Sequence, residues 1–499
     1  VTIVTAGSLI HSSTSVNRWI EMLQLILLLP LANYVRCELP DIASRSFNNN
    51  NDMYDYIANN ETVAEFAFRD PDVDLPTVSY SLTFFLLRSS NCLVLSPIHQ
   101  PDLIRRAGYY AEAHVVQTAD GYLLTLHRIP GSLGSPVETN KPSVILQHGL
   151  LASSADWVIP GKGKGLAYIL SDLGYDVWLG NARGNTYSRA HTNLSVSDSK
   201  FWNFTWHEMG VYDIPAIIEY ITSYKKERSL LYVGHSMGTT MFYVMASQRP
   251  DVANKVRAMF SLAPVAYVNH LKTFLDPPTT FVQIYIDFSS LLNNLSRISY
   301  RFILRFLAKY GCDVNVSEEK ICANSLFVLC GFDKEQFNDT LLPTILGHTP
   351  AGASTKTLIH YAQGINTGQF RQYDYGEKKN LEIYHNATPP EYDLSKIQFH
   401  SKVTKTYEVS PTRDIIFCFS LTKDVDRLYQ ALPVKLGKYR VNFPKFNHLD
   451  FLWGVDAPKL VYEKLLSLMK KYKQEVKKRR FYARNHSFGA NIANHTSYP

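Results

Sequence analysis

Short apolar stretches alternate with longer amphipathic ones through the middle of the chain, from His114 onward. The first two predict a β-hairpin over 113–128, with its turn at Thr118-Ala-Asp-Gly121. Further strands, separated by helical stretches, are expected at 143–147, 176–179, 230–233 and 258–262. Strands that alternate with helices predict an α/β protein with a doubly wound, mostly parallel sheet.

The alternation stops between Ala266 and about Tyr392. Within this part, an aromatic-rich stretch at 281–307 has the spacing of amphipathic helices whose apolar faces pack. A strand-like run at 439–443 and a helix expected at 458–473 then return to the first pattern. With 45% apolar residues, the 499-residue chain can build one large α/β domain of roughly 250 residues and a second unit of comparable length.

The amino-terminal part contains an apolar run at 22–32 that has the length of a signal-peptide core and is too short to span a bilayer. We therefore expect secretory targeting, with a buried helix as the alternative. A second apolar run at 78–95 carries Arg88 in its middle, so no stable membrane span is expected there. Nine Asn-x-Ser/Thr sequons fit an exported chain. They lie at Asn60, Asn193, Asn203, Asn294, Asn315, Asn338, Asn386, Asn485 and Asn494.

The formal net charge is +7, but residues 470–480 alone hold seven basic residues against Glu475. The rest of the chain is therefore close to neutral, which argues against nucleic acid as a partner. We interpret the basic tail as a solvated helix end, with adhesion to anionic lipid as the alternative.

Six cysteines are few for a scaffold built on disulfides. Cys312 and Cys322 lie ten residues apart around a polar loop, a spacing that allows a local disulfide in an oxidising compartment. No cysteine pair has the spacing of zinc ligands, and Gly161-Lys-Gly-Lys-Gly165 lacks the Gly-Lys-Ser/Thr ending of a phosphate loop. No metal and no cofactor are therefore expected.

The stretch around Ser236 carries the strongest chemical signal. An apolar strand at 230–233 precedes Gly234-His-Ser-Met-Gly238, and a helical run continues to Gln248. Strand, sharp turn and helix are the context that a G-x-S-x-G nucleophile elbow requires. The N-terminus of the helix would then face any negative charge that develops beside the serine. An ordinary glycine-rich turn is the alternative.

Two further segments offer partners for a nucleophilic serine. His148-Gly-Leu-Leu151 follows an expected strand, and a small loop there can present the N–H of Leu150 beside that of Met237 to an oxyanion. His448 lies late in the chain, in a loop between an expected strand and an expected helix, where this type of fold places its base.

On these motifs the chain resembles the acid lipases, the family of the gastric and lysosomal lipases and their insect relatives. The likeness extends from about Leu103 to Met469. Its segments are 120–130, 147–157, 174–189, Trp206-His-Glu-Met-Gly210, Gly234-His-Ser-Met-Gly-Thr-Thr240, His348-Thr-Pro-Ala-Gly-Ala353 and Asn447-His-Leu-Asp-Phe-Leu-Trp453. The resemblance implies an α/β-hydrolase fold with an inserted, largely helical cap, and hydrolysis of neutral lipid esters at a lipid–water interface.

The resemblance also implies roles for particular residues. Ser236 would be the nucleophile and His448 the base, while Leu150 and Met237 would supply the oxyanion N–H groups. It further implies a disulfide between Cys312 and Cys322, and a cap over the serine whose apolar underside forms a tunnel for the acyl chain.

The acid of the triad is where the chain departs from the family. The family pattern is approximately Asp-x-Leu-Ala-x-x-x-Asp-Val; Lys423-Asp-Val425 matches its end, and counting back puts Phe417 in the place of the acid. Asp414 and Asp424 are two substitutes, and Asp424 is the better one if 415–420 forms a strand. The acid is therefore not identified by the sequence.

Residues 398–420 do not resemble the family, and 78–99 is a similarly foreign insert. Either the protein has replaced or lost its acid, or non-coding nucleotides have been translated there. We favour the second interpretation, because Ile415-Ile-Phe-Cys-Phe-Ser420 is what a translated pyrimidine tract would give.

Two functions are compatible with these features. The first is a secreted or lysosomal serine hydrolase that cleaves lipid esters of the triacylglycerol or cholesteryl ester type; the second is a non-catalytic lipid-binding relative with an incomplete triad. The expected organisation is a segment 1–37 with the signal sequence, an extension 38–102, a hydrolase core 103–265, a cap 266–392, the rest of the core 393–473 and a basic tail 474–499.

Overall fold

The computed structural model describes residues 100–270, 333, 335–397, 406–410 and 422–471. The chain divides into two compact units, Val1–Ser96 and Pro97–Pro499, and every described residue belongs to the second. Several sequence-based predictions concern residues outside the described part. They are the signal sequence, the insert at 78–99, the stretch at 281–307, the pair Cys312 and Cys322, the residues Asp414 and Phe417, and the basic tail.

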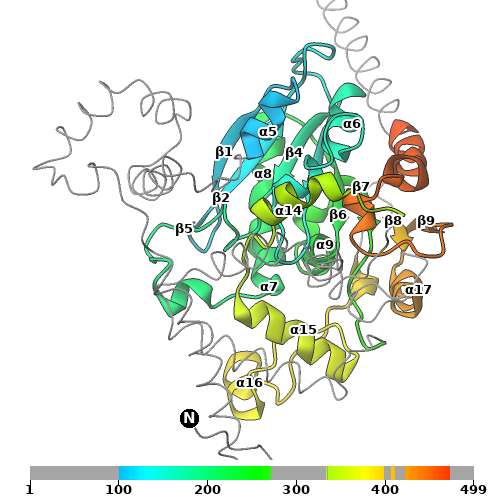
Figure 1. Ribbon diagram of the computed structural model, residues 1–499. Helices are drawn as coiled ribbons and strands as arrows, with labels where there is room; N and C mark the ends of the chain where they lie inside the picture. Colours follow the sequence, from blue (N-terminus) through cyan, green and yellow to red (C-terminus); the bar gives the residue numbers. More distant parts are fainter. Residues whose placement is uncertain (1–99, 271–332, 334, 398–405, 411–421, 472–499) are drawn as a thin grey trace, which may run out of the picture. The chain divides into compact units, whose positions relative to one another are not determined.

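One sheet forms the centre of the second unit (Figure 1). Its strand order is β1-β2-β4-β3-β6-β7-β8-β9, and β5 pairs with β2. The strands are β1 (Glu112–Gln117), β2 (Tyr122–Ile129), β3 (Ser143–Gln147), β4 (Asp176–Gly180), β5 (Ala190–His191), β6 (Leu230–His235), β7 (Val256–Leu262), β8 (Thr406–Ser410) and β9 (Lys435–Arg440). β2 pairs antiparallel with β1, β4 and β5, whereas all neighbours from β4 to β9 pair in parallel. The mostly parallel α/β sheet is confirmed.

Helices connect these strands (Figure 1). They are α5 (Gln100–Arg106), α6 (Leu166–Asp172), α7 (Trp206–Glu208), α8 (Ile214–Tyr224), α9 (Met237–Gln248), α10 (Pro250–Ala253), α14 (Leu342–His348), α15 (Thr355–Thr367), α16 (Glu377–Tyr384), α17 (Thr422–Ala431) and α18 (Asp450–Trp453). Short 3₁₀ segments are η2 (Ser154–Trp157), η3 (Ser199–Trp202), η5 (Asp339–Leu341) and η6 (Leu394–Lys396). Two π-helical segments lie within longer helices: η4 (Met209–Asp213) joins α7 to α8, and η7 (Pro458–Tyr462) is part of a helix that continues to Lys471.

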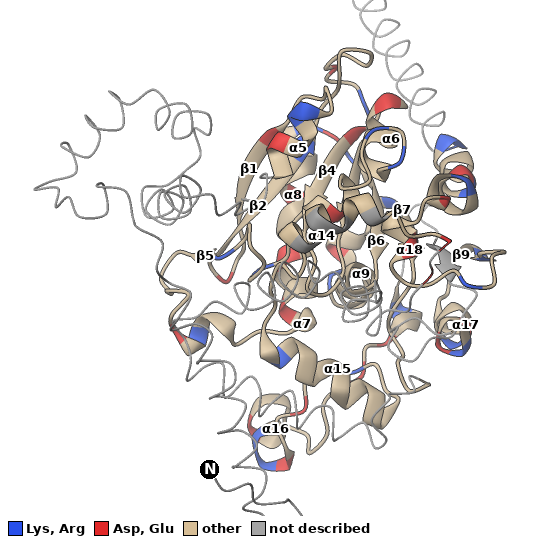
Figure 2. Cartoon of the chain, viewed as in Figure 1, with Lys and Arg blue, Asp and Glu red and all other residues tan. Residues whose placement is uncertain are grey.

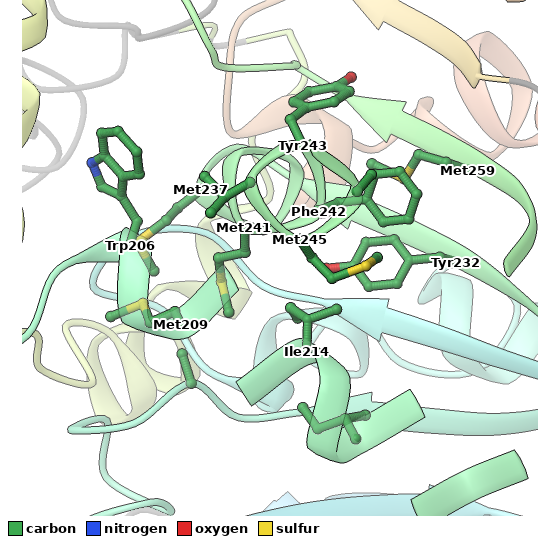
Figure 3. Close-up of a cluster of buried hydrophobic side chains, with 14 of the residues drawn as sticks. Trp206, Met209, Ile214, Tyr232, Met237, Met241, Phe242, Tyr243, Met245 and Met259 are labelled. Atoms are coloured by element: carbon green, nitrogen blue, oxygen red, sulfur yellow. The ribbon is translucent and has the colours of Figure 1, made fainter. Parts of the chain in front are cut away.

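The two faces of the sheet pack into two separate apolar clusters. Successive residues of a strand point to opposite faces, so Ile145 and Tyr232 join one cluster with α8 and α9. Their neighbours Val144 and Leu231 join the other, with α5, α6 and the C-terminal helix. Figure 3 shows Tyr232 and Met241 within the first cluster. Strands buried on both faces are continuous apolar runs, which explains why β3, β4, β6 and β7 could be predicted.

The last strands differ from the expectation. β8 lies inside 398–420, the stretch that does not resemble the family, and pairs in parallel with both β7 and β9. The strand expected at 439–443 is wrong in position, since β9 is Lys435–Arg440. Exposed Lys435, Lys438 and Arg440 alternate along β9, and such charges are typical of an edge strand. Because these basic residues interrupt the strand, β9 lacks the continuous apolar run by which a strand is recognised in a sequence.

The described part of 266–392 is built from helices. Its elements are α14, α15, α16 and η5, with one isolated bridge between Arg371 and Glu391. Gln336 binds the chain after α18: its side chain donates to Asp456 Oδ2 over 2.9 Å, and its carbonyl accepts the N–H of Val455 over 2.9 Å. Gln336 therefore stays beside the C-terminal part of the core.

Charged side chains of both signs are interspersed on the outer helices α5, α16 and α17, whereas the central strands carry few (Figure 2). Within the part of the chain that the structure describes, no helix combines the length and the apolar character that crossing a bilayer requires.

Candidate active site

Ser236 stands at the turn between β6 and α9, at the carboxyl end of a central parallel strand. Its backbone has φ 53° and ψ −120°, a positive-φ conformation that residues other than glycine rarely adopt. The serine is 4% exposed, and its N–H donates to Leu262 O over 3.0 Å. Strand, strained turn and helix are the geometry of a nucleophile elbow. The local structure predicted around Ser236 is present.

The glycines on either side of the serine are required by close backbone contacts. A Cβ on Gly234 would lie 2.9 Å from the carbonyl of Gly238, and a Cβ on Gly238 would overlap the backbone oxygen of Gln147. The elbow therefore packs directly against the end of β3. These contacts explain why the motif needs glycine at both positions.

Replacing Gly238 with alanine should lower the free energy of unfolding by about 1–3 kcal/mol, because the added methyl group must displace backbone. Chemical denaturation measures this change. Gly134→Ala is the matched control, because a Cβ there meets no atom within 4 Å, and it should change the free energy by less than about 0.5 kcal/mol. Equal effects of the two substitutions would contradict the close packing of the elbow.

The loop after β3 lies against the serine. A Cβ on Gly149 would be 3.0 Å from Ser236 Cβ, so a larger residue there would press tightly against the serine. Leu150 follows directly, and Met237 is the first residue of α9, whose N–H has no partner one turn earlier in the helix. Figure 3 places the Met237 side chain beside Trp206, in the apolar cluster of α9. The two candidate oxyanion donors thus come from segments that both adjoin Ser236.

His148 holds this loop in place. Its Nε2 accepts the N–H of Ala182 over 3.0 Å, so its Nδ1 carries the proton and donates to Gly149 O over 2.7 Å. Burial lowers the pKa of His148 to about 4, which keeps the ring neutral. Hence His148 orients the backbone beside the serine.

A buried arginine fixes the loop that contacts His148. Arg183 forms a bidentate pair with Asp120, at 2.6 and 2.9 Å, and its Nε donates to Asp213 over 2.7 Å. Its guanidinium also lies over the Tyr122 ring, 4.0 Å from the centroid. The network ties the turn of the first hairpin and the start of α8 to the loop after β4.

His448 lies in the loop between β9 and α18 and is 4% exposed. Its backbone oxygen accepts the Nε2–H of His235 over 3.0 Å, and the two ring centroids are 4.8 Å apart. Because His235 directly precedes the serine, the structure brings the loop of the candidate base to the elbow. Burial, reinforced by nearby His235, lowers the pKa of His448 well below its usual value. The neutral ring that a general base requires is therefore favoured.

No described residue supplies the acid of a triad. His448 Nδ1 is buried and has no hydrogen-bond partner within the described residues. Asp424, the better of the two substitutes proposed from the sequence, is in the first turn of α17 and pairs with His270 instead. Its Oδ1 is 2.6 Å from His270 Nδ1, and its Oδ2 accepts the His270 N–H over 3.2 Å. Asp424, in the first turn of the helix that begins at Thr422, is thus bound to His270 in the segment that follows β7.

Sequence analysis missed two residues that hold the loop of His448. Asp450 Oδ2 accepts the N–H of Asn447 over 2.7 Å, and Asn447 Oδ1 accepts the N–H of Leu449 over 2.9 Å. Burial raises the pKa of Asp450 to about 8, and the charge of Asp333 acts in the same direction. The sequence does place an Asn and an Asp on either side of the candidate base. Because such side chains bind backbone N–H groups in turns, their role in holding this loop could have been predicted.

Within the described ranges, no three His, Cys, Asp or Glu side chains are grouped so that they could hold an ion.

Comparisons with known proteins agree with this fold. Residues 100–161 match the family model for a partial alpha/beta-hydrolase lipase region, and residues 142–297 match the model for the alpha/beta hydrolase fold. Lipase 1 of Drosophila melanogaster is 39% identical over 385 residues, which cover 77% of this chain and 82% of the relative. Lipase member K of Homo sapiens is 37% identical over 369 residues, which cover 74% of this chain and 89% of the relative. Gastric triacylglycerol lipase of Homo sapiens is 36% identical over 376 residues, again 74% and 89%.

The strand order, the elbow and the family models define a protein of the α/β-hydrolase fold. The identity with lipases over most of their length narrows the class from the α/β-hydrolase fold to one family. The chain belongs to the acid lipase family, as its motifs predicted.

Proposed function

We propose that this chain is a serine hydrolase that cleaves lipid esters of the triacylglycerol or cholesteryl ester type. Ser236 is the nucleophile, His448 is the general base, and Leu150 and Met237 provide the oxyanion N–H groups. The observation that carries the proposal is the strained backbone of Ser236, which adjoins Gly149 and whose neighbour His235 binds the loop of His448. Membership of a lipase family and the gastric triacylglycerol lipase among the relatives support this class of substrate.

The reaction proceeds through an acyl-enzyme. His448 takes the proton of Ser236 as the serine oxygen attacks the ester carbonyl, and the carbonyl oxygen becomes an oxyanion. The N–H groups of Leu150 and Met237 stabilise that charge, together with the N-terminus of α9. The tetrahedral intermediate expels the alcohol, which takes the proton from His448. Water then attacks the carbonyl of the acyl-enzyme while His448 takes a proton from the water. His448 returns this proton to Ser236 as the fatty acid is released.

The proposal also covers the segment over the active site and the compartment in which the protein works. Residues 266–392 form a cap, and its apolar underside accepts the acyl chain at a lipid–water interface. The helical character of α14, α15 and α16 supports this assignment. Secretion or lysosomal delivery, glycosylation at some of the sequons and a Cys312–Cys322 disulfide belong to the same proposal, because they suit an oxidising compartment.

A non-catalytic lipid-binding protein is the second candidate. The specific observation in its favour is His448 Nδ1, which has no partner among the described residues. The lipase relatives favour the hydrolase.

A fluorophosphonate should label one serine per chain, slowly because His448 Nδ1 has no acid partner among the described residues, and peptide mass spectrometry should locate the label on Ser236. The reaction forms a bond between Ser236 Oγ and phosphorus, releases fluoride and transfers the serine proton to His448. Ser236→Ala should remove the label.

The matched control for this labelling is Ser261→Ala, which removes another buried serine at the end of the neighbouring strand β7. That variant should label as the unmodified chain does. Labelling that persists in Ser236→Ala would overturn the assignment of the nucleophile, and no labelling of the folded chain would favour the lipid-binding alternative.

A further inference from the structure

His235 joins the elbow to the loop of the candidate base. It is the last residue of β6, is 3% exposed and directly precedes Ser236. Its Nε2 lies 3.0 Å from the backbone oxygen of His448, which is 213 residues away in the sequence. Its ring also packs against that of Phe451, with the centroids 6.4 Å apart.

The hydrogen bond determines the tautomer of His235. A carbonyl oxygen only accepts, so Nε2 must carry the proton, and in the neutral ring Nδ1 is then a bare acceptor. Nδ1 lies 3.2 Å from where a Cβ on Gly149 would be, so that edge of the ring faces the oxyanion loop. His235 therefore contacts three segments: the elbow, the loop after β3 and the loop of His448.

The ionisable groups around His235 are His148 from the loop after β3 and His448 from the loop before α18. Asp450 in α18 lies two residues beyond His448. Burial lowers the pKa of His235 to about 4, and the neighbouring His148 adds to this shift. The ring is therefore neutral above about pH 5, and its single proton stays on the nitrogen that donates to His448.

We propose that His235 is a positioning residue for the proposed reaction: its ring N–H fixes the backbone of His448 and so holds the imidazole of the base over Ser236. The inference rests on the proposed function, since it concerns the geometry of that base. It explains how His448 is placed although its own Nδ1 has no partner in the described part of the chain.

The loop of His448 is held on both sides of the imidazole. On the carboxyl side, its carbonyl is bound by His235; on the amino side, the N–H of Asn447 is bound by Asp450 over 2.7 Å. The peptide group after His448 and the one before Asn447 are therefore both held, which limits how far the backbone that carries the imidazole can shift. Loss of one anchor lets the ring shift, and a misplacement of about 1 Å costs on the order of 100-fold in rate.

Two substitutions separate the hydrogen bond from the volume of the ring. His235→Phe keeps a planar ring and removes the donor. His235→Gln keeps an N–H at approximately the reach of Nε2. The readout is the rate of fluoride release from a short-chain fluorophosphonate by the full chain, analysed into inhibitor binding and the chemical step, from pH 3 to pH 8.

We expect His235→Phe to lower the rate constant of the chemical step by about 10- to 100-fold with unchanged inhibitor binding. His235→Gln should stay within about threefold of the unmodified chain. In both variants the acid limb of the pH profile should move to higher pH. The reason is that protonated His235 lowers the pKa of His448, so its removal raises that pKa, and the base is then protonated at a higher pH.

His114→Phe is the control, because His114 is also a histidine whose ring is held by hydrogen bonds, to Tyr220 Oη and Glu112 Oε2 over 2.9 Å each, but it lies in β1 at the edge of the sheet. It should change the melting temperature but neither the rate nor the pH profile. Equal rates for His235→Phe and the unmodified chain would overturn the inference and leave the proposed function intact. If His235→Phe and His235→Gln lowered the rate constant of the chemical step equally and the acid limb did not move, the inference would be overturned. His235 would then act only by packing. No reaction in the unmodified chain would overturn the proposed function, and the inference with it.

Discussion

Placing an aspartate beside His448 should raise kcat for ester hydrolysis by about 10⁴-fold, the loss caused by removing the acid from a serine triad. An acid on Nδ1 fixes the tautomer of the histidine and stabilises the imidazolium, and here Nδ1 has no partner within the described residues. The gain corresponds to about 5.5 kcal/mol of transition-state stabilisation. The variant replaces 411–420 with the equivalent residues of a relative that contains Asp-x-Leu-Ala, and leaves β8 unchanged. Initial rates on an emulsified triacylglycerol measure the effect.

The control for this graft carries Asn in place of its first Asp. It has the same backbone and packing but cannot stabilise the imidazolium, so it should remain close to the unmodified chain. Full activity of the unmodified chain, lost in Asp424→Asn, would contradict the prediction and make Asp424 the acid despite its pairing with His270.

The second large effect concerns stability. Arg183→Met should lower the free energy of unfolding by about 3–5 kcal/mol, because it leaves the carboxylate of Asp213, which is fully buried, without its partner. Urea denaturation followed by far-UV circular dichroism measures the change. The same substitution should also weaken the labelling of Ser236, since Arg183 holds the loop that binds His148.

Arg249→Met is the matched control. Arg249 pairs with Asp251 at the surface, where the two side chains are 36% and 60% exposed, and such pairs contribute at most about 1 kcal/mol. A loss below 1 kcal/mol for Arg183→Met would show that Asp213 takes up a proton or another partner instead.

The parts of the fold that the sequence predicted are those set by local constraints. The elbow needs two glycines around one serine within five residues, and the structure explains both by contacts that involve Gly234 and Gly238. The central strands are buried on both faces, so each is an apolar run that stands out. β9 has exposed basic residues along an edge and does not stand out, which is why its position was predicted wrongly.

Pairings between distant segments could not be derived from the chain alone. Asp424 was chosen because it follows a stretch of strand character, but its partner His270 is 154 residues away. His235 appeared only as the variable residue of the elbow motif, yet it binds a backbone oxygen in another loop. Both pairings depend on which loops the sheet order brings together, and no pattern of residue types records that.

The anchors at His270 and Gln336 have a consequence for how this family can diversify. His270 is held beside Asp424 and Gln336 beside Asp456, so the core fixes both ends of the sequence between these two anchors. When both ends of a segment are fixed by the core, the entropy of closing it grows slowly with length, by about 0.6 kcal/mol for each doubling. Insertions, deletions and whole exchanges of this segment therefore cost the core little. The sequence between the two anchors can therefore change while the elbow and the loop of His448 keep their positions.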